Sequence, residues 1–431
     1  MDSREKLQGD AGEQAVNTLA FDTYLKYWCY PGPKDESNFD KEICDLLILF
    51  QDNLILISVK NYAFKGNYSR YFRSTLDKAT AQLAGAERRL QDNSRPLVFR
   101  HADLGEIGFD PADYPNIHRI IVNHDIAPMF YPASRLTSAG NFVHIFNWDA
   151  FLGVVRELDT IPDFIQYLRE RELIFGGKQV TIMQGDEADW EIEVHRSFME
   201  YNTEFVAPDS HFLLISGREL DLMADYLWNN RKFNSNLYNP VYQGASFEFD
   251  GKYKRYLDQK EVQAKKQADR LSYFVDEFVK REVMYRNETT NLELAVELLS
   301  LSRFERRIVG SEFFAMLRQY RDAGPDLLVR RYGKTKDMVI AFVLYGSGMP
   351  HDMVLHLSQL AAEGYAWWNK YKEKKIVIIS FSKEGSGFKF GLLNVQPFTA
   401  QHETELVHDL QLLKWFTDFQ VFEVNHKEYP G

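Results

Sequence analysis

Residues 41–62, KEICDLLILFQDNLILISVKNY, combine two apolar runs with an aspartate and a lysine. The runs LLILF and LILI predict strands at about 43–50 and 54–60. We expect a tight turn at Asp52-Asn53 between them, because Asp and Asn tolerate the positive φ of hairpin turns. Side chains alternate between the two faces of a strand, and here both faces are apolar. The hairpin therefore belongs in the middle of a sheet, with helices on both sides.

The polar residues of this hairpin gather at the end remote from the turn. With the turn at Asp52-Asn53, Asp45 directly faces Lys60, and Ser58 shares their face. Burying a charge is costly unless the charge is paired, bound to a metal or used in chemistry. One explanation is a cross-strand ion pair, which contributes about 0–1 kcal/mol when it is exposed. The other is a functional site.

The surrounding elements predict a mixed sheet flanked by helices. Apolar residues recur at helical spacing over 5–28, and Glu13 lies at the edge of that stripe. A strong helix follows the hairpin at 74–92, then strands at 117–124 and 141–147 and one or two helices over 148–174. The order helix, strand, strand, helix, strand predicts an α/β fold, more specifically an α+β arrangement around a mixed sheet.

The order of the polar residues resembles the PD-(D/E)XK nuclease superfamily. In that pattern a helical acid precedes an Asp at the end of one strand, and a polar residue, any residue and a Lys lie on the antiparallel neighbour. Here Glu13 stands in GDAGEQAV, Asp45 ends the first apolar run, and Ser58-Val59-Lys60 ends the second. Gln82, in KATAQLAGAERRL, matches a polar residue of the following helix. The resemblance covers about residues 8–150 and is greatest to Mrr-type restriction endonucleases and nuclease-related domains.

This resemblance implies a metal-dependent hydrolysis of phosphodiesters with Mg²⁺ or Mn²⁺ as the cofactor. Asp45 would be the main ligand, helped by Glu13 and the backbone carbonyl of Val59, and Lys60 would orient or deprotonate the attacking water. Gln82 would contact a ligand water or the substrate. Many members carry a Glu where this chain has Ser58, which favours a one-metal or inactive site. Glu42 is a further candidate ligand, and its alternative is a solvated loop charge.

The loop after the hairpin, NYAFKGNYSRYFRSTLDK (61–78), alternates cations and aromatic rings. Cations suit phosphates and rings suit base stacking, so we expect nucleic-acid contacts here. The candidate residues are Lys65, Tyr68, Arg70, Tyr71 and Arg73. The alternative is that the rings fold onto the core while the cations reach outward into solvent.

The rest of the chain divides into two further segments. We expect a nuclease-like domain at 1–180, a largely helical region at 181–300 and an α/β domain at 301–431. The stretch 310–346 has an acid on a helix (Glu312), then Asp326 and a hairpin, but its second strand carries no lysine. The last domain is therefore a candidate for an inactive copy of the first, used for recognition or to form a homodimer.

Composition excludes several classes of protein. A net charge of −11 argues against a protein that coats nucleic acid with its whole surface, although a local basic cleft is compatible with it. No stretch approaches the roughly 20 apolar residues of a membrane helix. The two cysteines, Cys29 and Cys44, match no metal or disulfide spacing, so we expect a reducing cytoplasm. No phosphate-binding or dinucleotide motif occurs.

Taken together, these patterns predict a metal-dependent endonuclease. DNA is the favoured substrate and RNA the other, and restriction-type relatives suggest bacterial defence. The alternative is a catalytically inactive nucleic-acid-binding or scaffolding protein on the same fold.

Overall fold

The computed structural model divides the chain into two compact units, Met1–Gln263 and Ala264–Gly431. The residues described are 3–24, 26–35, 41–124, 130–184, 196–198, 200, 211–238, 244–285, 291–335, 338–385, 387–417, 419, 421 and 424–430, with side chains from residue 14 onward. This boundary differs from the three segments expected from the sequence. The α/β class is confirmed, because both units combine helices with mixed sheets.

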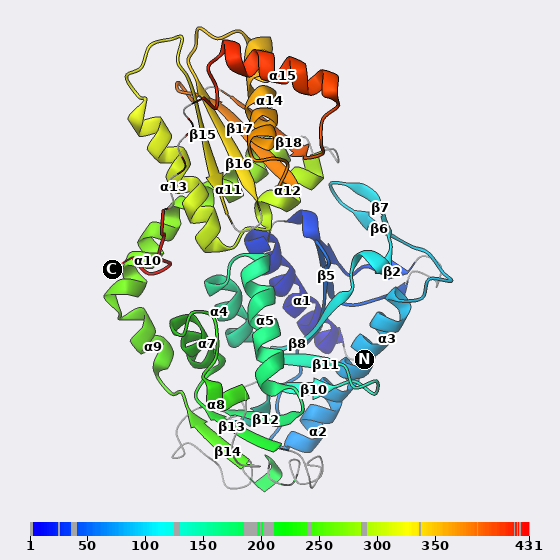
Figure 1. The fold of residues 1–431 in the computed structure, drawn as a ribbon. Coiled ribbons are helices and arrows are strands. Elements are labelled where there is room, and N and C mark those ends of the chain that lie inside the picture. Colours follow the sequence, from blue (N-terminus) through cyan, green and yellow to red (C-terminus); the bar gives the residue numbers. More distant parts are fainter. Residues whose placement is uncertain are drawn as a thin grey trace. The chain divides into compact units, whose positions relative to one another are not determined.

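The first unit is built on a sheet in the order β1-β4-β5-β8-β11-β10 (Figure 1). Its strands are β1 (Cys29–Pro31), β4 (Leu46–Phe50), β5 (Asn53–Lys60), β8 (Asn116–Asn123), β10 (Ser134–Leu136) and β11 (Phe142–Asn147). β4 runs antiparallel to β5, whereas β5, β8 and β11 are mutually parallel. The hairpin thus lies inside the sheet, as its two apolar faces predict.

The hairpin turn lies one residue earlier than expected. Phe50 pairs with Asn53, so the turn is Gln51-Asp52, and Gln51 adopts the positive φ of 52°. Asn53 instead begins β5, because it also pairs with Asn116 of β8. The Asp52 carboxylate accepts hydrogen bonds from the amides of Asn53 and Asn116 and so anchors the turn.

Helices cover both faces of this sheet. On one face, Arg119 of β8 bonds to Glu87 of α3 (Lys78–Leu90), which follows the short α2 (Tyr68–Phe72). The other face carries α1 (Ser3–Tyr24), α4 (Trp148–Glu157) and α5 (Ile161–Phe175). Their aromatic side chains pack together, since Tyr24 and Phe151 both contact Phe164.

A second sheet extends the first unit beyond residue 180. It has the order β14-β13-β12-β9 and is formed by β9 (Phe130–Pro132), β12 (Lys178–Met183), β13 (His211–Ser216) and β14 (Gly244–Glu248). The expected boundary at 180 therefore falls inside β12, and the largely helical middle region also contributes β13 and β14 to this sheet. Ladder partners on both sides hold the short apolar run of β12 extended.

Smaller elements complete this unit. Two arms, β2 (Lys34–Asp35) with β3 (Lys41–Glu42) and β6 (Leu97–His101) with β7 (Gly105–Phe109), project from the sheet. The remaining helices are α7 (Glu219–Trp228), α8 (Ser235–Tyr238), α9 (Lys252–Leu257) and α10 (Lys260–Ala268), the last of which runs across the boundary between the units.

The second unit repeats the element order of the first core. Helix α13 (Arg303–Gln319) precedes the antiparallel hairpin of β15 (Leu328–Lys334) and β16 (Val339–Tyr345). Helix α14 (His351–Trp368) then leads to β17 (Lys375–Ser382), which is parallel to β16, and β18 (Phe388–Asn394) closes the sheet. Also present are α11 (Tyr273–Phe278), α12 (Leu292–Leu299) and α15 (Ala400–Leu412). β16 reads VIAFVLY, without a charged residue.

Within the described ranges, no helix has the length and apolar character that crossing a membrane requires.

Candidate functional site

The predicted polar residues converge at the end of the β4–β5 hairpin. Lys60 Nζ lies 4.0 Å from Asp45 Oδ2, and the two side chains are 13% and 17% exposed. The same Asp45 oxygen accepts a hydrogen bond from the Val59 amide. Asp45 therefore has one oxygen held by the backbone of the neighbouring strand.

The register at this end differs from the expected one by two residues. Leu46 pairs with Ile57, which places Asp45 opposite Ser58 and diagonal to Lys60. The expected pairing of Asp45 directly with Lys60 is wrong, because the turn comes one residue earlier. The expected faces still hold, since a shift of two residues leaves the alternation of side chains unchanged.

A cavity of about 1000 Å³ opens beside Asp45. Glu42, Ser58 and Gln82 line it together with Asp45, so four of the predicted polar side chains meet at one space. Four basic residues, Lys41, Arg88, Arg89 and Arg95, and two further carboxylates, Asp35 and Asp92, also line it. Arg89 pairs with Asp35 and Arg95 with Asp92. Gln82 reaches the cavity because α3 lies over the face of the sheet that bears Ser58.

Glu42 faces the same space as Asp45. The pKa of its carboxyl is raised, because the cavity walls desolvate it and because the charge of Asp45 is close; Lys34 and Lys60 oppose this shift. Two neighbouring carboxylates at one cavity are suited to a shared cation. Glu42 is exposed but lines the cavity, and its role as a ligand stays a prediction.

Glu42→Gln is expected to stabilise the metal-free fold at pH 7, by at most about 1 kcal/mol because the side chain is exposed. A raised folded-state pKa favours the protonated carboxyl, so its stabilising effect is present at low pH and is lost as the pH rises through the folded pKa. Glutamine does not ionise, so the variant does not lose this stability as the pH rises. Urea unfolding in chelator at pH 4 and pH 7 measures the difference, which should be larger at pH 7. An equal difference at both pH values would contradict the assignment.

Two of the other predicted ligands are described only in part. Glu13 falls within α1, but its side chain lies outside the described residues, so its role stays a prediction. Val16 and Ala20, which follow it on the helical stripe, are buried as expected. The amide of Val59 binds Asp45, and its carbonyl stays a predicted ligand.

Tyr68 and Tyr71, the two rings expected to stack on bases, are buried. Tyr68 and Tyr71 are 0% and 4% exposed, in contrast to their expected role at a nucleic-acid surface. The Tyr68 hydroxyl accepts a hydrogen bond from the Phe130 amide, and the Tyr71 hydroxyl donates one to Asn123. Their burial follows from α2, which turns this stretch inward.

The cations of the same segment lie outside. Lys65, Arg70 and Arg73 are exposed, as the alternative of rings on the core and cations in solvent predicts. Their contact with nucleic acid stays a prediction.

Charged residues of α3 that resemble solvated helix charges are in fact structural. Glu87 is 5% exposed and binds Arg119 and the Asn141 amide. Arg89 pairs with Asp35, which is 2% exposed. Only tertiary structure brings these partners together, because they are far apart in the sequence. Arg88 remains exposed at the rim of the cavity.

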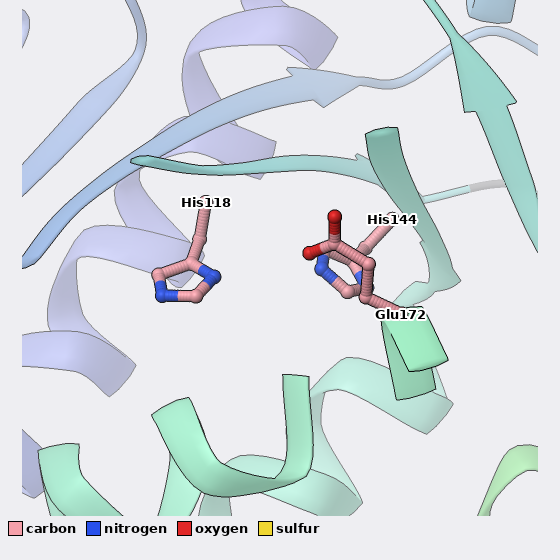
Figure 2. A group of neighbouring side chains, drawn as sticks. All are labelled: His118, His144 and Glu172. Carbon is pink, nitrogen blue, oxygen red and sulfur yellow. The ribbon is translucent and has the colours of Figure 1, made fainter. Parts of the chain in front are cut away.

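A second cluster, His118, His144 and Glu172, lies on the opposite face of the sheet, and sequence reasoning missed it. One candidate ligand atom from each residue lies within 4.8 Å of those of the other two. Figure 2 shows the Glu172 carboxylate beside the His144 ring, with the His118 ring turned toward them. His118 is the one histidine of β8 (NIHRIIVN), and His144 is the one histidine of β11 (FVHIFN). A lone histidine in an apolar strand was the available signal, but no spacing motif links it to Glu172.

Comparisons with known proteins do not assign the chain to a family. No family model matches the chain, and no curated protein matches it. A solved structure described as "Crystal structure of SSO0001" has 12% sequence identity and a TM-score of 0.15 over 38% of this chain and 91% of that one. A likeness at this level carries no argument about fold or function.

Proposed function

We propose that the chain is a metal-dependent phosphodiesterase that cleaves nucleic acid at the end of the β4–β5 hairpin. The observation that carries this proposal is the approach of Lys60 to Asp45 within 4.0 Å, beside a cavity that Glu42, Ser58 and Gln82 also line. A purely structural ion pair at a sheet end does not require a second carboxylate or a large open space beside it.

The donor atoms fit a hard divalent cation. Asp45 and Glu42 supply carboxylate oxygens, and Ser58 and the Val59 carbonyl add neutral oxygens, which is the chemistry that Mg²⁺ and Mn²⁺ prefer. Desolvation and, second to it, the charge of Asp45 raise the pKa of Glu42, and a bound cation would relieve both effects. When bound, the ion would supply charge stabilisation and an activated water.

The protein groups have separable roles in this proposal. The Val59 amide fixes one oxygen of Asp45 and thus orients the carboxylate. The Lys60 ammonium donates hydrogen bonds to the scissile phosphate or to the attacking water. Gln82 positions the substrate from α3, and the exposed Lys41, Arg88 and Arg95 bind the phosphodiester backbone across the cavity.

The test is cleavage of plasmid, linear DNA and RNA by the full chain with Mg²⁺, Mn²⁺ or chelator. We expect metal-dependent cutting of DNA by the wild type and none by Asp45→Asn. Asp113→Asn, an exposed aspartate away from the cavity, is the matched control and should cut normally. If the wild type cuts no substrate but binds DNA with a steep salt dependence, the chain is the inactive binding protein instead. A role in bacterial defence rests on the family resemblance.

Replacing Lys65, Arg70 and Arg73 together with alanine is expected to weaken DNA binding without loss of fold, because all three are exposed. The plot of log affinity against log salt should become shallower by about 2 to 3 units, since each phosphate contact contributes about 0.9. Fluorescence anisotropy at several salt concentrations measures this slope. A control triple variant of Lys254, Arg255 and Lys260, also exposed, should keep the wild-type slope. Equal slopes for wild type and the first triple variant would remove this loop from the interface.

A further inference from the structure

His118 presents an unusual problem for a folded core. Its side chain is 5% exposed, and neither ring nitrogen has a hydrogen-bond partner among the described residues. An unsatisfied buried polar group costs about 1–3 kcal/mol. Both Asp and Arg side chains lie in this region, yet none of the described ones bonds to the ring. The ring therefore lacks a partner that a bound species would supply.

His118 and its two neighbours, His144 and Glu172, are metal-ligating side chains on three separate elements. β8 and β11 are parallel, and His144 pairs with Ile120, so His118 and His144 emerge on the same face two positions apart. Glu172 reaches them from α5, which covers that face (Figure 2). Arg119, the next residue on β8, points to the other face and binds Glu87.

We propose that His118, His144 and Glu172 form a binding site for a divalent transition metal ion, with Zn²⁺ as the best fit. Two imidazoles and one carboxylate are a donor set that Zn²⁺ takes readily, with a water in the fourth position. Mg²⁺ disfavours such nitrogen ligands, so this ion is different from the one proposed at Asp45. Bound there, the ion ties α5 to two strands of the sheet.

The charges around the cluster are compatible with a cation. Arg171 is paired with Glu219 and Arg119 with Glu87, so each guanidinium has its own counterion. The carboxylate of Glu172 supplies negative charge. Burial, with smaller contributions from Arg169 and Arg119, lowers the pKa of His118 to about 4, so the ring is neutral at pH 7 and one of its nitrogens offers a lone pair.

One contact weakens the site. Arg171 Nη1 lies 3.3 Å from Nδ1 of His144 and can only donate to it. Metal binding through the other nitrogen places the ring proton on Nδ1, and Arg171 must then move away. Arg171 already donates to Glu219 and to the carbonyls of Ala133 and Ile145, so it does not depend on this contact. The result is a lower affinity rather than a blocked site.

The experiment uses the full chain with the first site disabled by Asp45→Asn and Glu42→Gln. After removal of metals with chelator, we expect one equivalent of Zn²⁺ by calorimetry, and Co²⁺ should give the visible absorption bands of nitrogen coordination. Adding Glu172→Gln should weaken Zn²⁺ binding at least about tenfold, since even the outer-shell partners of metal ligands contribute 10–100-fold. His118→Gln should abolish it.

Two control variants separate ligation from general effects. Glu170→Gln makes the same charge change on α5, where Glu170 bonds to Tyr238, and His408→Ala removes an exposed histidine. Both should bind Zn²⁺ like the parent. Far-ultraviolet circular dichroism must show that the ligand variants are folded. If His118→Gln is unfolded, Glu172→Gln still tests the proposal, because Glu172 is exposed. Absence of stoichiometric Zn²⁺ binding, or equal binding in the Glu172→Gln variant, would overturn the proposal and leave a bridging water as the partner of His118.

Discussion

Lys60→Met is expected to reduce metal-dependent cleavage by about 10²–10⁴-fold while leaving the free energy of unfolding nearly unchanged. The ammonium lies 4.0 Å from Asp45, beyond hydrogen-bond distance, and Asp45 keeps its hydrogen bond from the Val59 amide, so the ion pair contributes little to stability. Methionine keeps most of the apolar stem in place. The rate should fall because Lys60 is the only cationic side chain of the hairpin at 46–60 and would stabilise the charge on the phosphate.

The cleavage rate and the stability of Lys60→Met, measured together, distinguish a catalytic role of Lys60 from a structural one. If the Asp45–Lys60 pair only stabilised the end of the sheet, Lys60→Met would lower stability and leave any cleavage unchanged. Cleavage is measured under single-turnover conditions at saturating Mn²⁺, and stability by urea unfolding in chelator. Lys254→Met, at an exposed lysine outside the proposed interface, is the matched control for a lost positive charge. Full activity of Lys60→Met would rule out a catalytic lysine.

The sequence predicts which residues share a face at the site better than it predicts how they pair across the strands. Strand alternation alone places Asp45, Ser58 and Lys60 on one face, and any register shift by an even number of residues preserves that result. The exact partner of Asp45 depended on the turn. There the ladder between Asn53 and Asn116, a contact between distant segments, decided against the expected Asp52-Asn53 turn.

The aromatic loop shows the limit of composition as a guide. Cations and rings at 61–78 suit either a nucleic-acid surface or a packed helix with solvated charges. The rings of Tyr68 and Phe198 pack edge to face, and Phe198 lies far along the chain. No local pattern reveals that partner. The cations, in contrast, are exposed under both interpretations, so their placement was predictable.

Buried charges were the least predictable feature. Arg171 and Glu219 are 48 residues apart in the sequence, and each side chain is 0% exposed. Both stand in amphipathic stretches where a charged residue normally faces solvent. Their burial depends on the packing of α5 against α7 and the sheets, which sequence periodicity does not specify. The cluster of His118, His144 and Glu172 escaped sequence reasoning for the same reason.

Glu219→Gln is expected to destabilise the first unit by about 3–5 kcal/mol, although it changes the side chain by one atom. The Glu219 carboxylate accepts from Nε and Nη2 of Arg171 and from the Tyr167 hydroxyl. Glutamine keeps the shape but leaves the Arg171 cation in a fully buried place without a counterion. The loss of charge, rather than a cavity, therefore sets the size of the effect.

Two further variants test this explanation. The double variant Arg171→Met/Glu219→Gln removes both charges and should recover part of the stability lost in Glu219→Gln, because no uncompensated charge remains. Glu106→Gln breaks the pair of Glu106 with Arg100, which are 67% and 70% exposed, and should change stability by less than about 1 kcal/mol. Urea unfolding at pH 7 gives all three values. A double variant less stable than Glu219→Gln would show that Arg171 stabilises the core chiefly through its bonds to the carbonyls of Ala133 and Ile145, and not through its charge pair.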